Sequence, residues 1–112
     1  MVSTDLQEIE QNIKDAEEFV KAGEAIGRLM VNRDFKRVVL NGYFKDEAVR
    51  LVHLKGITNV QSEGAQRYID DQIKAISLFA QYLDTVASQA EMAKAGISEA
   101  EDLRLELVNS EQ

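Results

Sequence analysis

The stretch "FKRVVLNGYFKDEAVRLVHL" (Phe35–Leu54) decides between two folds for this chain. An Asn-Gly pair between apolar runs is the strongest short signal for a β-hairpin. The flanks do not alternate apolar with polar residues, however, and a lone two-stranded hairpin would have no sheet to join. We therefore predict two short helices, residues 34–40 and 44–54, with Asn41-Gly42 as a helix C-cap or kink between them. The hairpin is the alternative.

Composition also favours helices. The chain has 112 residues, six glycines and no proline, which leaves little material for the many turns of a β-protein. Good helix formers dominate. The length fits one domain, so we expect a single all-α domain over residues 1–112. The absence of cysteine excludes disulfides, thiolate zinc sites and cysteine nucleophiles.

Outward from the central stretch, both flanks predict long amphipathic helices. The N-terminal flank predicts a helix over residues 4–31, beginning with a capping box from Thr4 to Gln7. Its apolar or small residues recur with 3-4 spacing. They are Leu6, Ile9, Ile13, Ala16, Val20, Gly23, Gly27 and Met30.

The C-terminal flank predicts a loop over residues 55–62 and then a helix over 63–95 that starts after Ser62. Its apolar stripe again has 3-4 spacing. The residues are Ile69, Ile73, Ile76, Ala80, Leu83, Ala87 and Ala90. Gly96 is expected to end this helix in a Schellman turn, and a capping box at Ser98 predicts a short final helix over 99–108.

These elements predict an antiparallel hairpin of two long helices with a two-helix elbow between them and a short C-terminal helix. Gly23 and Gly27 lie on one face of the first long helix, where each glycine costs about 1 kcal/mol relative to alanine. Two glycines on one face indicate that either a bulky side chain or a second backbone approaches there, and Phe79 and Leu83 of the second long helix are the large residues expected to fill the space.

Positive charge is concentrated in the elbow. From Arg28 to Lys55 seven basic residues face three acidic ones, a balance of +4, which leaves −11 for the rest of a chain whose total is −7. This segment either neutralises the acidic helices or forms a docking surface for an acidic partner or phosphates. Aromatic residues and arginine are common anchors of interfaces. The expected partner-binding residues are Phe35, Lys36, Arg37, Tyr43, Phe44 and Arg50.

No catalytic or ligand motif stands out in the sequence. The single histidine, His53, lacks a second ligand at metal-binding spacing, and no Gly-rich phosphate loop is present. We expect no enzyme activity, no metal and no cofactor. Two short helices joined at a glycine outline a helix-turn-helix, but the surrounding acidic charge repels phosphates and makes nucleic acid an unfavoured partner. Neither a secretory signal nor a run of about 20 apolar residues is visible, so a soluble intracellular protein is expected.

Two segments carry a resemblance to a known group of proteins. They are "DFKRVVLNGYFKDEAVRLVHL" (34–54) and "QIKAISLFAQYLDTV" (72–86). With the Phe-x-x-Val-x-Leu-x-Gly-Tyr core and the following Glu-Ala-x-Arg-Leu, the region of about residues 30–90 resembles small acidic helical proteins of the structural and packaging genes of tailed bacteriophages. The resemblance carries over no active-site residue.

The resemblance implies a non-enzymatic virion or head-morphogenesis accessory protein that contacts portal, capsid or terminase. It would be located in the virion or the host cytoplasm, and we expect it to self-associate. A second hypothesis is an acidic inhibitor of a host defence or nucleic-acid-processing enzyme, in which the long helices imitate a phosphate backbone. A third is a small DNA-packaging adaptor.

Overall fold

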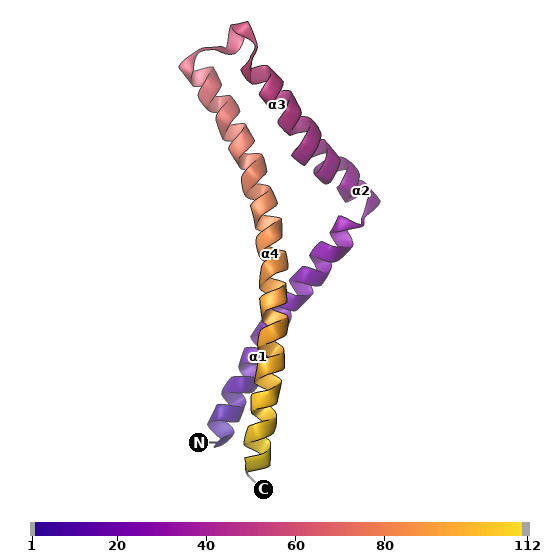
Figure 1. Cartoon of the computed structure of the whole chain (residues 1–112), viewed down its shortest axis with the longest axis vertical. Coiled ribbons are helices and arrows are strands. Elements are labelled where there is room, and N and C mark those ends of the chain that lie inside the picture. Colours follow the sequence, from indigo (N-terminus) through magenta and orange to yellow (C-terminus); the bar gives the residue numbers. More distant parts are fainter. Residues whose placement is uncertain (1, 111–112) are drawn as a thin grey trace. The chain divides into compact units, whose positions relative to one another are not determined.

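A computed structural model describes the backbone of residues 2–110 and the side chains of residues 4–110 (Figure 1). These residues are almost entirely helical and contain no strand, so the all-α prediction is confirmed and the β-hairpin is excluded. The elements are α1 (Val2–Met30), α2 (Arg33–Phe35), the π-helical segment η1 (Lys36–Glu47), α3 (Ala48–Lys55), the 3₁₀ turn η2 (Thr58–Val60) and α4 (Glu63–Ser110). Among the described residues, no helix combines the length and apolar character needed to cross a bilayer.

The chain forms two compact units where one domain was expected. Unit 1 combines residues 2–27 of α1 with residues 85–110 of α4, and unit 2 is Arg28–Asp84. The long helix α4 therefore contributes its first part to one unit and its second part to the other. Each unit buries its own apolar residues.

Unit 1 is an antiparallel pair of helical segments (Figure 1). Ile9 and Ile13 of α1 and Ala90 of α4 are its buried residues, as the 3-4 spacing predicts for all three. A Cβ atom added to Gly23 would clash with the Cβ of Ala90. The backbones of α1 and α4 therefore approach closely here, with a glycine facing an alanine.

The expected filling of this space by Phe79 and Leu83 is wrong. Ala90 is the residue opposite Gly23, and a Cβ on Gly27 would meet nothing within 4 Å. Phe79 instead contacts aromatic rings within unit 2. The physical reason is that a small residue at both positions lets two helix backbones come together, so no large side chain is required there.

The predicted stop at Gly96 is also wrong, because α4 continues to Ser110 as one helix where helices over 63–95 and 99–108 were expected. No glycine in the described residues has the positive φ that a Schellman turn needs. Ile97 and Ala100 remain half-buried and extend the stripe of Ala90 by further helical turns. Packing along unit 1 thus carries the helix past the glycine. At the other end of the chain, α1 already includes residues before Thr4, so Thr4 lies inside the helix.

In unit 2 the predicted helices 34–40 and 44–54 are one continuous helical run from Arg33 to Lys55. Asn41-Gly42 does not end the helix, because the run has i→i+5 hydrogen bonding over Lys36–Glu47, and this wider turn keeps the glycine inside the helix. A Cβ on Gly42 would lie 3.0 Å from the backbone oxygen of Arg37, five residues earlier, which is a tight contact.

The helical run packs along the first part of α4 (Figure 1). Leu51, Ile69 and Ile76 form the buried core of unit 2, and Leu51 is only 2% exposed. Half-buried residues surround this core. They are Tyr43, Phe44, Ala48, Leu54, Val60 and Ile73. The elbow is therefore a packed layer on the first part of α4.

The connection between α3 and α4 is held by side-chain bonds to the backbone. Gln66 Nε2 donates to the carbonyl oxygens of Lys55 at 3.0 Å and Val60 at 2.9 Å. Lys55 Nζ lies 2.7 Å from Asp70 Oδ1. Helix α4 begins at Glu63, where Ser62 Oγ accepts a bond from the Ala65 backbone N–H at 3.2 Å. These bonds fix the turn that returns the chain onto α4.

Candidate protein-contact surfaces

Unit 2 carries an apolar groove between η1 and α4, which we call the unit 2 groove. Its cavity volume is about 590 Å³. The lining residues are Val38, Val39, Gly42, Tyr43, Glu47 and Phe79. Val38 is 66% exposed, although it is apolar. An apolar groove that opens to solvent is the usual form of a protein-contact site.

The π-helical geometry creates this groove. Val38 and Glu47 are nine residues apart, which is about two and a half turns of an α-helix and would place them on opposite faces. With hydrogen bonds that skip five residues, nine residues make about two turns, so both side chains line the same groove. Sequence periodicity misses this arrangement because it assumes the α-helical repeat.

Two groove residues, Tyr43 and Phe79, belong to an aromatic cluster that also includes Phe44. The rings of Tyr43, Phe44 and Phe79 have pairwise centroid separations of 5.9, 6.1 and 5.5 Å at tilted or edge-to-face angles, within the range of favourable aromatic pairs. Phe44 and Tyr43 also pack against the Leu51 core. Two of the residues predicted to bind a partner therefore stabilise unit 2 itself, and Phe79 joins them although the sequence placed it elsewhere.

The charged residues of the helical run divide into paired and unpaired groups. Arg50 forms a two-bond ion pair with Glu47, with Nη2 3.0 Å from Oε2. This hydrogen bond holds the pKa of Glu47 below its ordinary value and raises the pKa of Arg50. Lys55 pairs with Asp70. Arg50 was expected to bind a partner, but its guanidinium already has a carboxylate.

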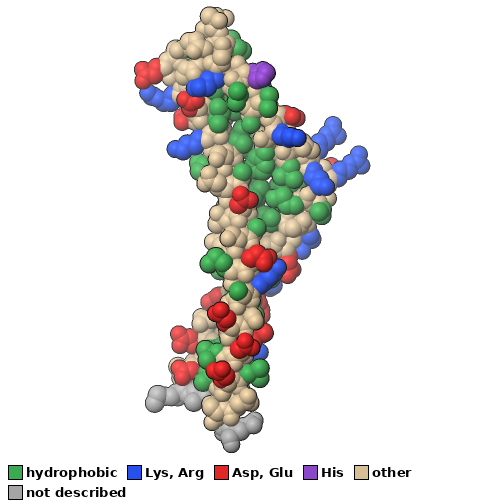
Figure 2. Space-filling view, viewed as in Figure 1, with side chains coloured by type: hydrophobic (Ala, Val, Ile, Leu, Met, Phe, Trp, Pro, Cys, Tyr) green, Lys and Arg blue, Asp and Glu red, His purple; other side chains and the backbone are tan. Residues whose placement is uncertain are grey.

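The remaining cations of the run form no salt bridge within residues 4–110. They are Arg33, Lys36, Arg37 and Lys45, and all four are exposed. Figure 2 shows hydrophobic side chains gathered over unit 2 with lysine and arginine along the outer edge of the helical run. Phe35, at the start of this region, is half-buried. The predicted residues Lys36 and Arg37 are thus exposed and form no salt bridge within residues 4–110, and Arg37 directly precedes the groove residue Val38.

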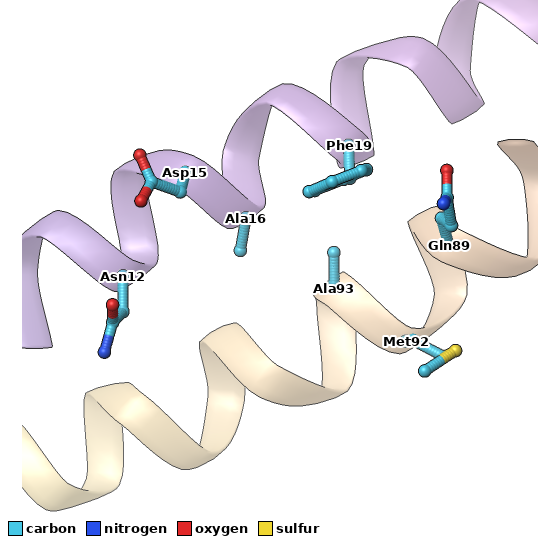
Figure 3. Close-up of a pocket in the computed structure, with 7 residues that line it drawn as sticks. All are labelled: Asn12, Asp15, Ala16, Phe19, Gln89, Met92 and Ala93. Carbon is cyan, nitrogen blue, oxygen red and sulfur yellow. The ribbon is translucent and has the colours of Figure 1, made fainter.

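Unit 1 carries a second apolar groove, along one side of the contact between α1 and α4. We call it the acidic groove. Its wider end, about 400 Å³, is lined by Asn12, Asp15, Ala16 and Phe19 from α1 and by Gln89, Met92 and Ala93 from α4. In Figure 3, Ala16 and Phe19 point from α1 toward Ala93 of α4. Phe19 is 46% and Met92 71% exposed, which is high for these residue types.

The acidic groove continues toward the N-terminal end of α1. A hollow of about 360 Å³ shares Asn12 with the first and is lined by Asp5, Glu8, Ile9, Asn12, Leu103 and Leu107. Three carboxylates and no lysine or arginine line the two hollows together. None of these carboxylates has a salt bridge in the part of the chain that the structure describes. Sequence analysis missed this groove because its walls come from segments about 80 residues apart in the chain.

The opposite side of the α1–α4 contact is different in character. The hollow there, about 520 Å³, includes Lys14 and Arg104 beside Glu10 and Glu17 and is mostly polar. Among residues 4–110, no three His, Asp or Glu side chains gather in a way that could hold a metal ion. The structure therefore offers two apolar grooves, one in each unit, as its candidate sites.

Comparison of the chain with protein-family models, with curated proteins and with solved structures finds no match.

Proposed function

We propose that this chain is a non-enzymatic assembly protein that binds a protein partner through the unit 2 groove. The observation that carries the proposal is the combination, on one helical run, of a solvent-open apolar groove and exposed cations without salt bridges within residues 4–110, among which Arg37 directly precedes the groove residue Val38. Apolar area supplies affinity and unpaired charge supplies orientation. The complementary partner presents an apolar ridge flanked by carboxylates.

The resemblance of residues 30–90 to tailed-phage proteins supports a particular partner class and place of action. The partner class is then a portal, capsid or packaging component, and the place of action is the virion or the host cytoplasm. Self-association belongs to the same proposal, since accessory assembly proteins act in several copies.

Binding to such components tests the proposal. The interface variant combines Val38→Asp with Arg37→Glu, which places charge in the groove and reverses charge at its edge. The control variant combines Leu78→Asp with Lys74→Glu, because Leu78 and Lys74 are an exposed apolar residue and an exposed cation of α4 that do not line the groove.

Binding is measured by surface plasmon resonance against purified portal, capsid and terminase proteins encoded beside this gene. We expect the interface variant to weaken a detected interaction at least about tenfold, a loss of about 1.4 kcal/mol, while the control changes it little. An interaction that both variants weaken equally would remove the groove from the proposal.

The acidic surface of unit 1 supports a second candidate function, inhibition of a nucleic-acid-binding enzyme. The sequence segments 1–27 and 85–112 carry thirteen acidic and four basic residues, a net charge of −9. Glu17 and Glu24 are exposed on α1 and form no salt bridge with any of residues 4–110, while Glu18 pairs with Lys21. The test is binding to a basic nucleic-acid-binding enzyme. This function is favoured over assembly if that binding weakens as the salt concentration rises and is lost when Glu17→Gln, Glu18→Gln and Glu24→Gln are combined.

A further inference from the structure

We propose that the acidic groove of unit 1 binds the outer face of the Arg33–Lys55 helical run of a second copy of this chain. This inference rests on the proposed assembly function and names both faces of the self-contact. It uses neither the unit 2 groove nor Val38, so each proposal can fail without the other.

The acidic groove has the surface chemistry to bind a cationic amphipathic helix. Its floor is apolar, with Ala16, Ala93 and the exposed side chains of Phe19 and Met92, and its rim holds Asp5, Glu8 and Asp15. Helices that fill such grooves insert apolar residues at one-turn spacing and place opposite charges at the rim. A cationic helix would neutralise rim carboxylates that have no salt bridge within the described residues.

The chain itself contains a helix of this kind. Lys36 and Lys45 are nine residues apart within η1 and so lie on one face, by the same π-helical repeat that aligns Val38 with Glu47. Val49 follows Lys45 by four residues and Val52 follows Val49 by three, which continues this face along α3. Both valines are more than half exposed and neither belongs to the unit 2 core. We call these four residues the basic stripe.

The two faces match in length as well as in charge. Residues 5–19 of α1, which border the acidic groove, span about 21 Å at 1.5 Å per residue. The basic stripe covers sixteen residue steps and spans at most about 24 Å by the same measure. Valines can therefore reach Phe19 and Met92 while lysines reach the rim. Because the two faces belong to different parts of the chain, each copy offers one face of each kind.

Light scattering after size exclusion tests the self-contact at several protein concentrations and at low and high salt. The stripe variant is Lys36→Glu with Lys45→Glu, and the groove variant is Glu8→Lys with Asp15→Lys. Two controls make the same charge changes elsewhere. Arg67→Glu with Lys74→Glu alters exposed cations of α4, and Glu10→Lys with Glu17→Lys alters the polar side of α1.

We expect the wild-type mass to rise above 12.6 kDa with concentration and to fall toward it in high salt. Each interface variant should raise the dissociation constant for self-association at least about tenfold, and each control less than about threefold. Mixing the stripe variant with the groove variant should restore association, because each variant retains the unaltered face that the other lacks.

A wild-type mass of 12.6 kDa at every concentration overturns the inference. A mixture that remains monomeric, or controls as damaging as the interface variants, also overturns it. The Val38→Asp, Arg37→Glu variant separates the two proposals: it should keep self-association while losing the assembly partner. If the wild-type chain is monomeric and this variant still loses partner binding, the self-contact is excluded and only the partner-binding part of the proposed function remains.

Discussion

Two glycines on the same helix face have opposite physical roles. Gly23 faces Ala90 so closely that a Cβ has no room, whereas a Cβ on Gly27 would meet only open space. The sequence places both in one small-residue pattern and cannot separate them, because the difference depends on which residue of α4 lies opposite. The same limit applies to Phe44, whose aromatic character predicts an interface but whose ring belongs to the unit 2 core.

The two glycines give opposite predictions for alanine substitution. Gly27→Ala should raise the free energy of unfolding by about 0.5–1 kcal/mol, since alanine forms helix better and fits without a clash. Gly23→Ala should lower it by roughly 1–3 kcal/mol, because α1 and α4 must separate to admit the methyl group. Chemical denaturation followed by circular dichroism measures both. Stabilisation by Gly23→Ala would contradict the close approach at Ala90.

Phe44 gives a prediction about folding. Phe44→Ala should destabilise the chain by about 3 kcal/mol, at the lower end for buried phenylalanine because the side chain is only half-buried. Lys36→Ala, an exposed residue of the same helical run, should change stability by less than about 0.5 kcal/mol. Thermal unfolding compares the two. Equal melting temperatures for wild type and Phe44→Ala would mean that Phe44 is a surface residue after all.

Among the elements, α1 and the first part of α4 could be predicted well, because their 3-4 spacing identifies Ile9, Ile13, Ile69 and Ile76 as buried. The failures concern glycine. Gly42 and Gly96 were interpreted as helix ends on local grounds, although both lie inside helices that packing or wider hydrogen bonding continues. The spacing of Ile97, Ala100 and Leu107 after Ala90 continues the apolar stripe and indicates that the second long helix extends past Gly96.

A substitution at Gly96 tests the continuity of α4. In a helix interior with open space around the Cβ position, Gly96→Ala should stabilise the chain by about 0.5–1 kcal/mol. In a left-handed helix cap the same change would destabilise it by a comparable amount or more. The sign of the shift in denaturation midpoint therefore distinguishes one helix from two.

The Glu47–Arg50 pair predicts a pH response of the helical run. The pKa of Glu47 is lowered in the folded chain by its hydrogen bond from Arg50, so the pair stabilises the fold above the unfolded pKa of about 4.3. This contribution is lost as the pH falls through the lowered folded pKa. Glu47→Gln should reduce the difference in melting temperature between pH 6 and pH 3, and Glu63→Gln should leave it nearly unchanged. Because both partners are at the surface, the effect should be small and weaker in salt.

For the whole molecule, the basic segment from Arg28 to Lys55 lies within one of the two units. Unit 2, Arg28–Asp84, carries nine basic and seven acidic residues, a net of +2, against −9 for the segments of unit 1. The sequence shows a basic island, but its meaning depends on which cations are paired, and only the structure separates Arg50 and Lys55 from Lys36 and Arg37. The acidic groove could not be predicted, because it exists only once distant segments pair.

Separate cores predict separate responses to core mutations. Leu51→Ala should cost about 2–5 kcal/mol and speed amide hydrogen exchange chiefly between residues 33 and 84. Ile13→Ala should destabilise the chain by a similar amount and speed amide hydrogen exchange chiefly in residues 4–27 and 85–110. Hydrogen exchange with mass spectrometry locates each response. Equal acceleration along the whole chain for both variants would show that the two units unfold as one.

The apolar stripe along α4 shifts by one residue where the part of the helix in unit 2 ends and the part in unit 1 begins. Ile69, Ile76, Leu83 and Ala90 recur every seven residues, but the companion positions shift from Ile73 and Ala80 to Val86 and Ala93, and Ala87 is exposed. This one-residue shift in the apolar pattern can be detected whichever apolar residues occupy the positions. Homologues of this chain that are too diverged for sequence alignment should be recognisable by a long helix in which the apolar spacing shifts by one residue between two regular heptad segments.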